Sequence, residues 1–204
     1  MKNFKLYLEF LFIYIIPPLV IIYLKEKYLL YLFLFFFCSI AFILLKKEKK
    51  KSLKEFFGKI EFKSLKFNLL FFIFAIHIYA LMIGLNSFYS MPIENIKLWI
   101  IIIIFYPIIS VFPQEIIYRV LFVERYKKLF VSKKDYSQIV NTFIFTYSHI
   151  VFQNHHAIII SAIASPIFYY QYTKKSFLNC FIIHSLGGYL IYTVGLGDFF
   201  FLNN

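Results

Sequence analysis

The stretch Pro113-Gln114-Glu115-Ile116-Ile117-Tyr118-Arg119 places a carboxylate and a guanidinium inside an apolar run that extends over residues 97–123. Each such charge costs about 2.5–3.5 kcal/mol at the centre of a membrane helix. Glu115 and Arg119 are four residues apart, so on a helix they share a face and can neutralise each other. One interpretation is a buried ion pair that locks neighbouring helices together. The other is a functional site, because ionisable residues inside a membrane mark functional sites by default.

The composition of the chain is that of a polytopic membrane protein. Of its 204 residues, 61% are hydrophobic, and the mean hydropathy is +0.75. Several windows approach the roughly 20 apolar residues that cross a bilayer. Because open sheets leave backbone groups unpaired in lipid, we expect an all-α transmembrane helix bundle. The bias toward Lys, Ile, Phe and Asn is typical of an AT-rich prokaryotic genome, so we expect an integral protein of a prokaryotic plasma membrane.

Seven apolar segments predict about seven spans. They cover residues 6–24, 28–45, 67–85, 97–123, 138–152, 157–172 and 176–196. Pro17-Pro18 is expected to kink the first span. Residues 46–66 carry nine lysines, with apolar residues at helical spacing, which predicts an amphipathic helix at the membrane surface. We therefore expect an N-terminal membrane hairpin with a basic cytoplasmic segment in residues 1–66, and a transmembrane core in residues 67–204.

The net charge of +12 indicates membrane topology. The lysines cluster between apolar segments, so they are expected to contact anionic headgroups and not nucleic acid. With a cytoplasmic N-terminus, 18 Lys and Arg residues lie on the cytoplasmic side and 3 outside, while Arg119 lies within the membrane. The positive-inside rule therefore predicts that orientation. In this orientation Lys25 and Lys27 fall in an outer loop. An alternative is therefore that the first two segments form a hairpin that does not cross the membrane fully.

Two cysteines and three histidines lie in the apolar segments. Cys38 and Cys180 are expected to be packing residues without a disulfide. At ~1.5 Å rise per residue, Glu115, His149 and His184 lie roughly 12, 16 and 12 Å from the predicted cytoplasmic ends of their segments. His77 lies about 15 Å from its cytoplasmic end by the same measure, so depth alone does not distinguish functional histidines from packing ones. We expect a hydrogen-bonded packing role for His77.

The surroundings of His149 and His184 favour a functional role. Phe145 precedes His149 by four residues, which places ring and imidazole on one helix face. His184 is followed by Gly187-Gly188, which lets another chain approach closely.

Glu115, His149 and His184 in a semi-dry cavity suit the activation of water. A carboxylate and an imidazole that share a water can act as general base, and a second imidazole can donate to an oxyanion. Zinc is a rival use, because one glutamate and two histidines form a common ligand set, but the sequence has no His-Glu-x-x-His motif. A proton-conducting transporter or channel is a third alternative, against which the lack of internal repeats argues.

These residues resemble the motifs of the CPBP family. The family comprises CAAX-type prenyl endopeptidases and bacteriocin-processing or immunity proteins, also called the Abi group. Its motifs EExxxR, FxxxH and HxxxN or HxxxD correspond here to Gln114-Glu115-Ile116-Ile117-Tyr118-Arg119, Phe145-Thr146-Tyr147-Ser148-His149 and His184-Ser185-Leu186-Gly187-Gly188. The resemblance covers residues 100–192, about half of the chain.

The resemblance implies a glutamate-dependent intramembrane endopeptidase that uses no metal or other cofactor and opens toward the cytoplasm. The implied site comprises the catalytic residues Glu115, His149 and His184, with Gln114, Arg119, Phe145 and Gly188 in support. Two positions depart from the family pattern. Gln114 stands where the family has its water-activating glutamate, and Gly188 stands where an Asn or Asp helps to hold the oxyanion.

Two functions follow from this pattern. The first is an intramembrane endopeptidase that cleaves a membrane-anchored protein or peptide, with Glu115 and His149 activating water and His184 stabilising the oxyanion. The second is a catalytically impaired pseudoprotease that binds membrane peptides or acts in bacteriocin immunity, which Gln114 and Gly188 motivate. In both cases the expected partners are a membrane-anchored peptide and the lipid bilayer, and no nucleic acid.

Overall fold

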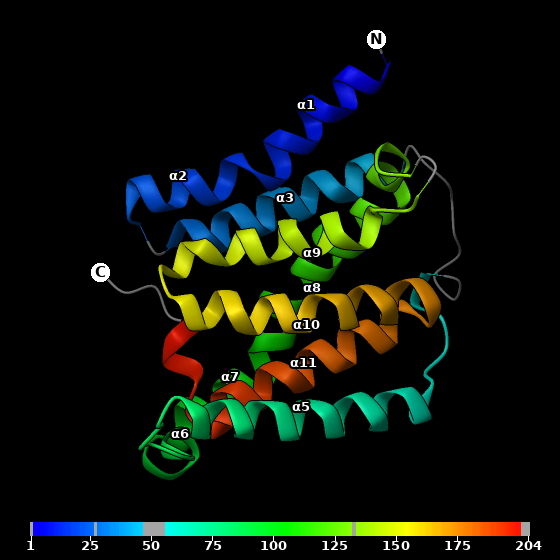
Figure 1. The fold of residues 1–204 in the computed structure, drawn as a ribbon. Helices are drawn as coiled ribbons and strands as arrows, with labels where there is room; N and C mark the ends of the chain where they lie inside the picture. The colour runs from blue at the N-terminus through cyan, green and yellow to red at the C-terminus, as the bar shows by residue number, and fades with distance from the viewer. Residues whose placement is uncertain (1, 27, 47–55, 132–133, 201–204) are drawn as a thin grey trace.

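The chain folds into a bundle in which most helices run roughly along one direction while the segment of residues 96–126 crosses them, as the computed structural model shows (Figure 1). The structure describes residues 2–26, 28–46, 56–131 and 134–200. Within these ranges, the only β-type pairing is a single bridge between Val131 and Asp135. The predicted all-α architecture is confirmed.

The described helices follow one another along the chain. Their bounds are α1 Lys2–Tyr14, α2 Ile16–Leu24, α3 Tyr28–Lys46, α5 Phe62–Met82, α6 Ser90–Glu94, α7 Ile96–Tyr106, η1 Pro107–Val111, α8 Phe112–Glu115, η2 Ile116–Tyr126, η3 Lys127–Leu129, α9 Ser137–Ser148, η4 His149–Phe152, α10 His155–Lys174, α11 Phe177–Val194 and η5 Gly197–Phe200. Of the elements marked η, η1 and η2 are π-helices and the others are 3₁₀ turns.

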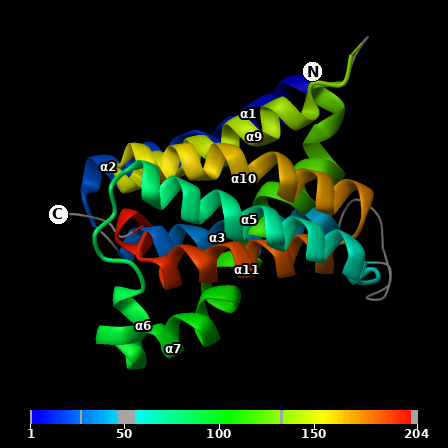
Figure 2. The same ribbon diagram turned by 60° about the horizontal axis from the view of Figure 1, so that its bottom comes forward.

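The number of spans differs from the expected seven. In the described part of the chain, five helical stretches are long and apolar enough to cross a membrane, namely Phe4–Leu24, Tyr28–Lys46, Phe62–Met82, Ile96–Leu129 and Phe177–Val194. The other two expected spans form α9 and α10. The α-helical part of α9 has only 12 residues, and α10 carries polar residues such as Gln171 and Lys174. Both helices lie side by side within the bundle (Figures 1 and 2).

The first span bends where the two prolines predict it. α1 ends at Tyr14, and Pro17 and Pro18 form the first turn of α2, where a missing backbone N–H is tolerated. The Tyr14 hydroxyl donates to the carbonyl oxygen of Ile117 at 2.8 Å, so the bend is fixed to the central helix η2.

Residues 47–55 of the predicted amphipathic helix lie outside the described residues. The end of that segment differs from the prediction, since residues 62–66 already belong to α5. Before α5 begins, Phe56 and Phe57 pack on Phe177. Their ring centroids lie 5.0 and 5.8 Å, respectively, from the centroid of Phe177. This contact fixes the start of the third apolar segment against α11.

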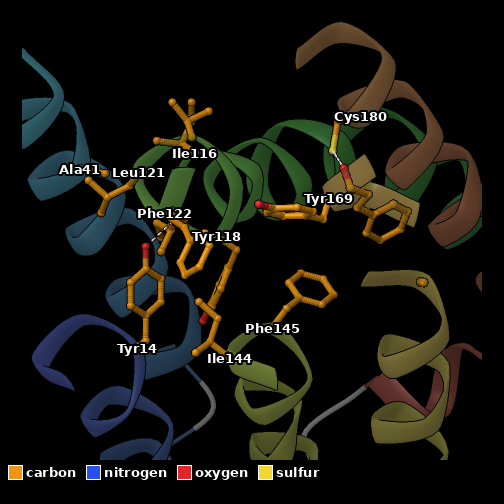
Figure 3. Packing of buried hydrophobic residues seen from close by; sticks show 14 of the residues in the cluster. Tyr14, Ala41, Ile116, Tyr118, Leu121, Phe122, Ile144, Phe145, Tyr169 and Cys180 are labelled. Atoms are coloured by element: carbon orange, nitrogen blue, oxygen red, sulfur yellow. Dashed lines mark hydrogen bonds between the residues drawn. The ribbon is translucent and has the colours of Figure 1, made fainter. Parts of the chain in front are cut away.

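The centre of the bundle is η2. Ile116, Leu121 and Phe122 are fully buried in one core cluster with side chains of neighbouring helices, and Tyr14 and Ile144 lie on the side of η2 that carries Phe122 (Figure 3). Because lipid tails are as apolar as these side chains, close packing holds the helices together more than exclusion from water does.

The winding of the central segment follows from two prolines. Pro107 begins η1, and Pro113 lies in the one-turn helix α8. A proline inside a helix removes a backbone donor and pushes on the preceding turn, and a wider π-turn accommodates this. π-turns occur often at functional sites. The quoted stretch 113–119 therefore lies on a locally rewound helix.

The outer surface is apolar, as expected of a protein whose solvent is lipid. Large side chains such as Met82, Phe62 and Phe74 are 78%, 77% and 64% exposed. On a soluble protein, patches of this kind would be aggregation sites or interfaces. The protein is an integral membrane protein.

Lysines gather at one end of the bundle. α3 ends at Lys46, α5 carries Lys63 and Lys66 in its first turns, and α10 ends at Lys174, all on the right in Figure 1. The charge distribution predicts this end to be cytoplasmic, and that orientation stays a prediction.

Candidate active site

Glu115 is fully buried at the end of α8, and its two oxygens have separate partners. Oε1 accepts a hydrogen bond from Nδ1 of His184 at 2.7 Å, and Oε2 accepts one from the thiol of Cys180 at 2.7 Å. Cys180 and His184 are four residues apart on α11, so they present one face of that helix to the carboxylate. The carboxylate thus fixes α8 to α11.

Arg119 compensates the buried carboxylate and joins three elements. Its Nε lies 3.8 Å from Oε2 of Glu115, which gives the predicted ion pair. Nη1 donates to Asn141 at 2.6 Å and Nη2 to Ser165 at 3.2 Å, and the guanidinium carbon lies 4.5 Å from the ring centre of Phe145. A buried charge is stabilised only with partners of this kind. Arg119 therefore connects η2 with α9 and α10.

The hydrogen bonds of His149 and His184 determine which ring nitrogen donates and which one is left for another partner. Nδ1 of His149 lies 2.8 Å from the carbonyl oxygen of Phe145, and a carbonyl only accepts, so Nδ1 carries the proton. Nδ1 of His184 faces the carboxylate of Glu115, which also accepts. With Nδ1 donating in both rings, Nε2 is the nitrogen that can carry a lone pair, and each histidine can act as a base through it.

The ring of Phe145 lies close to both imidazoles. Its centroid is 4.8 Å from that of His149 and 5.8 Å from that of His184. Among the hydrogen bonds and ion pairs of the described residues, none joins Glu115 to His149. The structure thus brings Glu115 to His184, and it places His149 beyond Phe145.

Both histidines line a cavity of about 850 Å³ with a mostly apolar wall. Gln114 belongs to the wall as well, and its side-chain amide donates to the hydroxyl of Ser110 at 2.8 Å. Glu115 is fully buried behind His184 and is not part of the wall. Neighbouring residues of the first motif therefore face different surroundings, the amide toward the cavity and the carboxylate toward the packed interior.

The cavity reaches toward the end of the bundle that lies opposite the lysines. Its wall includes Leu30 and Tyr31 near the start of α3, Met82 at the end of α5 and Phe200 in η5. The family resemblance implied an opening toward the cytoplasm, whereas these residues lie at the end that the lysine count predicts to be outside.

Gly188 lies one helical turn after His184 on α11 and faces α7. A Cβ atom at this position would come within 2.2–2.5 Å of the ring and hydroxyl of Tyr106. The space that a side chain at position 188 would fill is therefore taken by Tyr106.

Residues 95–190 match the family described as type II CAAX prenyl endopeptidase Rce1-like. All three sequence motifs and the helices that carry them lie within this range. The resemblance to the CAAX proteases is confirmed. Neither the curated proteins nor the solved structures contain a match to the chain.

The CAAX-protease-like segment contains site residues that the sequence motifs did not single out. They are Tyr106, Asn141, Ser165 and Cys180. The i, i+4, i+8 spacing of Cys180, His184 and Gly188 was a usable signal, because it places a thiol on the histidine face of α11. Nothing in the sequence distinguished Tyr106 as a site residue, because it is one of 17 tyrosines in the chain and belongs to none of the motifs. Within the described residues, no group of three His, Cys, Asp or Glu side chains is arranged to hold a metal ion.

Proposed function

We propose that this protein is an intramembrane endopeptidase that hydrolyses a peptide bond of a membrane-associated protein or peptide. The observation that carries the proposal is the buried hydrogen bond from His184 to Glu115, next to a cavity that His149 also lines. The match of residues 95–190 to CAAX prenyl endopeptidases supports the same reaction class.

His184 is the general base in this proposal. Glu115 holds its Nδ1 proton, fixes the tautomer and stabilises the imidazolium that forms, as the carboxylate of a Ser-His-Asp triad does. A water molecule gives a proton to Nε2 of His184 while the water oxygen bonds to the carbonyl carbon of the peptide bond that is cleaved. The tetrahedral intermediate then collapses, the C–N bond breaks, and the amine leaves with that proton.

The proposal divides the roles differently from the sequence-based hypothesis, which paired Glu115 with His149. Because Glu115 is fully buried, it acts through His184 and is a positioning residue. His149 offers its Nε2 lone pair to the same cavity and orients the attacking water.

Gln114 has a role that does not require a carboxylate. One of its two side-chain N–H groups is bound to Ser110, and the other is available to the cavity. Side-chain amides serve as oxyanion donors in other hydrolases. Glutamine in the first position of the motif is therefore compatible with hydrolysis.

New protein N-termini are the measurement that tests the proposal. The full-length protein is reconstituted in vesicles with a total membrane-protein extract, and newly formed N-termini are labelled and identified by mass spectrometry. We expect a set of cleavages that disappears with His149→Ala and with His184→Ala. His77→Ala is the matched control, because His77 binds Tyr89 and the carbonyl of Ile73, away from the cavity wall. Identical termini from wild type and His184→Ala would exclude hydrolysis by this site.

A pseudoprotease is the second candidate function. The observation that favours it is the amide of Gln114 facing the cavity where a carboxylate would be a base. This candidate predicts no new N-termini, together with equal photo-crosslinking of a photoreactive transmembrane peptide by wild type and His149→Ala. A role in bacteriocin immunity belongs to this alternative.

The proposed orientation in a prokaryotic plasma membrane has the N-terminus and the lysine end in the cytoplasm. Single cysteines introduced at Lys128 and at Ile93, with both native cysteines replaced, test it by labelling with a membrane-impermeant reagent in intact cells. We expect labelling at position 93 and none at position 128, and the reverse pattern would contradict the orientation.

A further inference from the structure

We propose that the hydroxyl of Tyr106 is an oxyanion donor of this site and that Gly188 exists to admit it. The inference rests on the proposed hydrolytic function and names a further catalytic residue for it. It starts from the close approach of Tyr106 to Gly188 on the face of α11 that carries His184.

The position of the hydroxyl follows from helix geometry. Residues 184 and 188 are one turn apart, so a side chain at 188 would project beside His184 into the cavity wall. A Cβ at Gly188 would lie 2.5 Å from Oη of Tyr106. The phenol oxygen therefore lies where a polar side chain on α11 would otherwise reach the substrate.

Neighbouring rings hold Tyr106 in this place. Its ring centroid lies 5.6 Å from that of Tyr192, 6.3 Å from that of Tyr189 and 6.5 Å from that of His184, which it meets edge-on. The hydroxyl of Tyr189 in turn donates to the carbonyl of Ile103 at 2.7 Å. The phenol is thus positioned by α11 and by its own helix α7.

The hydroxyl of Tyr106 is available to a ligand. Among the described residues, no hydrogen-bond partner of Tyr106 Oη is found, although the residue lines the cavity. Tyr106 is half-buried, and its hydroxyl is not among the buried side-chain atoms that lack a partner, so the O–H is accessible from the cavity. An O–H that lines the same cavity as two histidines, without an internal partner, is suited to donate to the negative oxygen of a tetrahedral intermediate.

Gly188 and Tyr106 form a coupled pair. Any side chain at 188 would push the phenol aside, because the ring atoms Cε1 and Cζ lie 2.2 and 2.5 Å from a Cβ there. Gly188→Ala therefore removes the donor as Tyr106→Phe does, and the two changes together cost no more than one alone.

The test compares two probes in nanodiscs that contain the full chain. One is a lipid-anchored hydrophobic peptide with a phosphinate in place of one peptide bond, which carries a tetrahedral anion. The other is the same peptide with an uncleavable N-methyl amide at that bond. We expect wild type to prefer the phosphinate and Tyr106→Phe to lose at least tenfold of that preference, with unchanged affinity for the N-methyl amide. Tyr23→Phe, an exposed tyrosine of α2 that does not line the cavity, is the matched control and keeps the preference.

Two further results complete the test. Gly188→Ala is expected to lose the preference in the wild-type background and to change nothing further in the Tyr106→Phe background. Equal preference in wild type and Tyr106→Phe, or no preference in wild type, overturns the inference. Because binding is the readout, a failure of the inference differs from a failure of the proposed function, which would show as missing cleavage by the wild-type protein.

Discussion

The Nδ1 atom of His184 lies 2.7 Å from Oε1 of Glu115, and the two side chains are 7% and 0% exposed. This contact spans 69 residues of sequence and joins α8 to α11. It leaves Nε2 of His184 as the ring nitrogen without a protein partner among the described residues. The contact therefore links the stability of the bundle to the chemistry of the cavity.

Replacing Glu115 separates these two contributions. Glu115→Gln keeps the size of the side chain but removes its charge, so the histidine tautomer is no longer fixed, and we expect cleavage to fall about 10²- to 10⁴-fold. Glu115→Ala also leaves Arg119 buried without its carboxylate and is expected to cost about 3–5 kcal/mol of unfolding free energy. Cleavage rates and denaturant unfolding of both variants measure the two effects. Wild-type cleavage by Glu115→Gln would contradict the role of the pair.

Gln114→Glu introduces a carboxylate into the cavity wall. The new group can take a proton from water directly, and we expect cleavage to rise about tenfold or more. Gln138→Glu is the matched control, because Gln138 is exposed at the start of α9. A rise in both variants would point to an effect of charge alone, and a loss in Gln114→Glu would favour the amide as oxyanion donor.

Arg119→Met tests the buried charge network. The change leaves Glu115 without its guanidinium and frees Asn141 and Ser165, so we expect a loss of about 3–5 kcal/mol in unfolding free energy. The double variant Glu115→Gln with Arg119→Met should recover part of this loss, because no unpaired charge remains. Lys128→Met, at an exposed position, is the control and should stay within about 0.5 kcal/mol of wild type.

The bond between Glu9 and Arg125 anchors α1. Nε and Nη2 of Arg125 donate to the two oxygens of Glu9 at 2.5 and 2.8 Å, and the Tyr126 hydroxyl donates to the same carboxylate. Both charged side chains are mostly buried, so we expect Glu9→Gln to cost about 1.5–3 kcal/mol. Hydrogen exchange should accelerate first in α1. Uniform acceleration over all helices would show that α1 is not a separate unit.

The start of α9 carries a pH dependence outside the membrane. The hydroxyl and the backbone N–H of Ser137 both donate to Asp135, and these bonds hold the pKa of Asp135 below its usual range. Because the folded-state pKa is the lower one, this stabilisation is complete above the unfolded-state pKa of about 3.9 and disappears as the pH falls through the folded-state pKa. Asp135→Ala should therefore lower the melting temperature at pH 7, and the difference from wild type should shrink toward pH 3. A difference that does not depend on pH would contradict this cause.

The spacing of the motifs was enough to predict which helices carry the candidate site residues. It predicted Glu115 and Arg119 on one apolar segment and His149 and His184 on two others, and the structure places all four near the cavity or just behind its wall. The pairing of Glu115 with His184 was not predictable in the same way. Depth along a helix axis says nothing of rotation about it, and the π-winding of η1 and η2 changes that rotation.

Two of the seven expected spans, α9 and α10, do not by themselves have the length and hydropathy of a membrane span. Hydropathy treats every polar side chain as if it faced lipid, and a short apolar run as if it had to cross alone. Gln171 of α10 exchanges hydrogen bonds with Ser64 of α5 and accepts one from Asn179 of α11, so this polar group is paired inside the bundle. The sequence pattern cannot distinguish a helix surrounded by other helices from one surrounded by lipid.

Gln114 and Glu115 are adjacent in the chain, yet one faces the cavity and the other the packed interior. Which of them faces the cavity is decided by how the backbone winds through η1 and α8 before it reaches them. Adding or removing one residue between Pro107 and Gln114 would rotate the following side chains by about 100°. Such a change would exchange the group offered to the substrate without replacing any side chain of the site. In this helix an insertion or deletion can therefore alter the chemistry as a point substitution would, and reactivity is encoded in chain length as well as in residue identity.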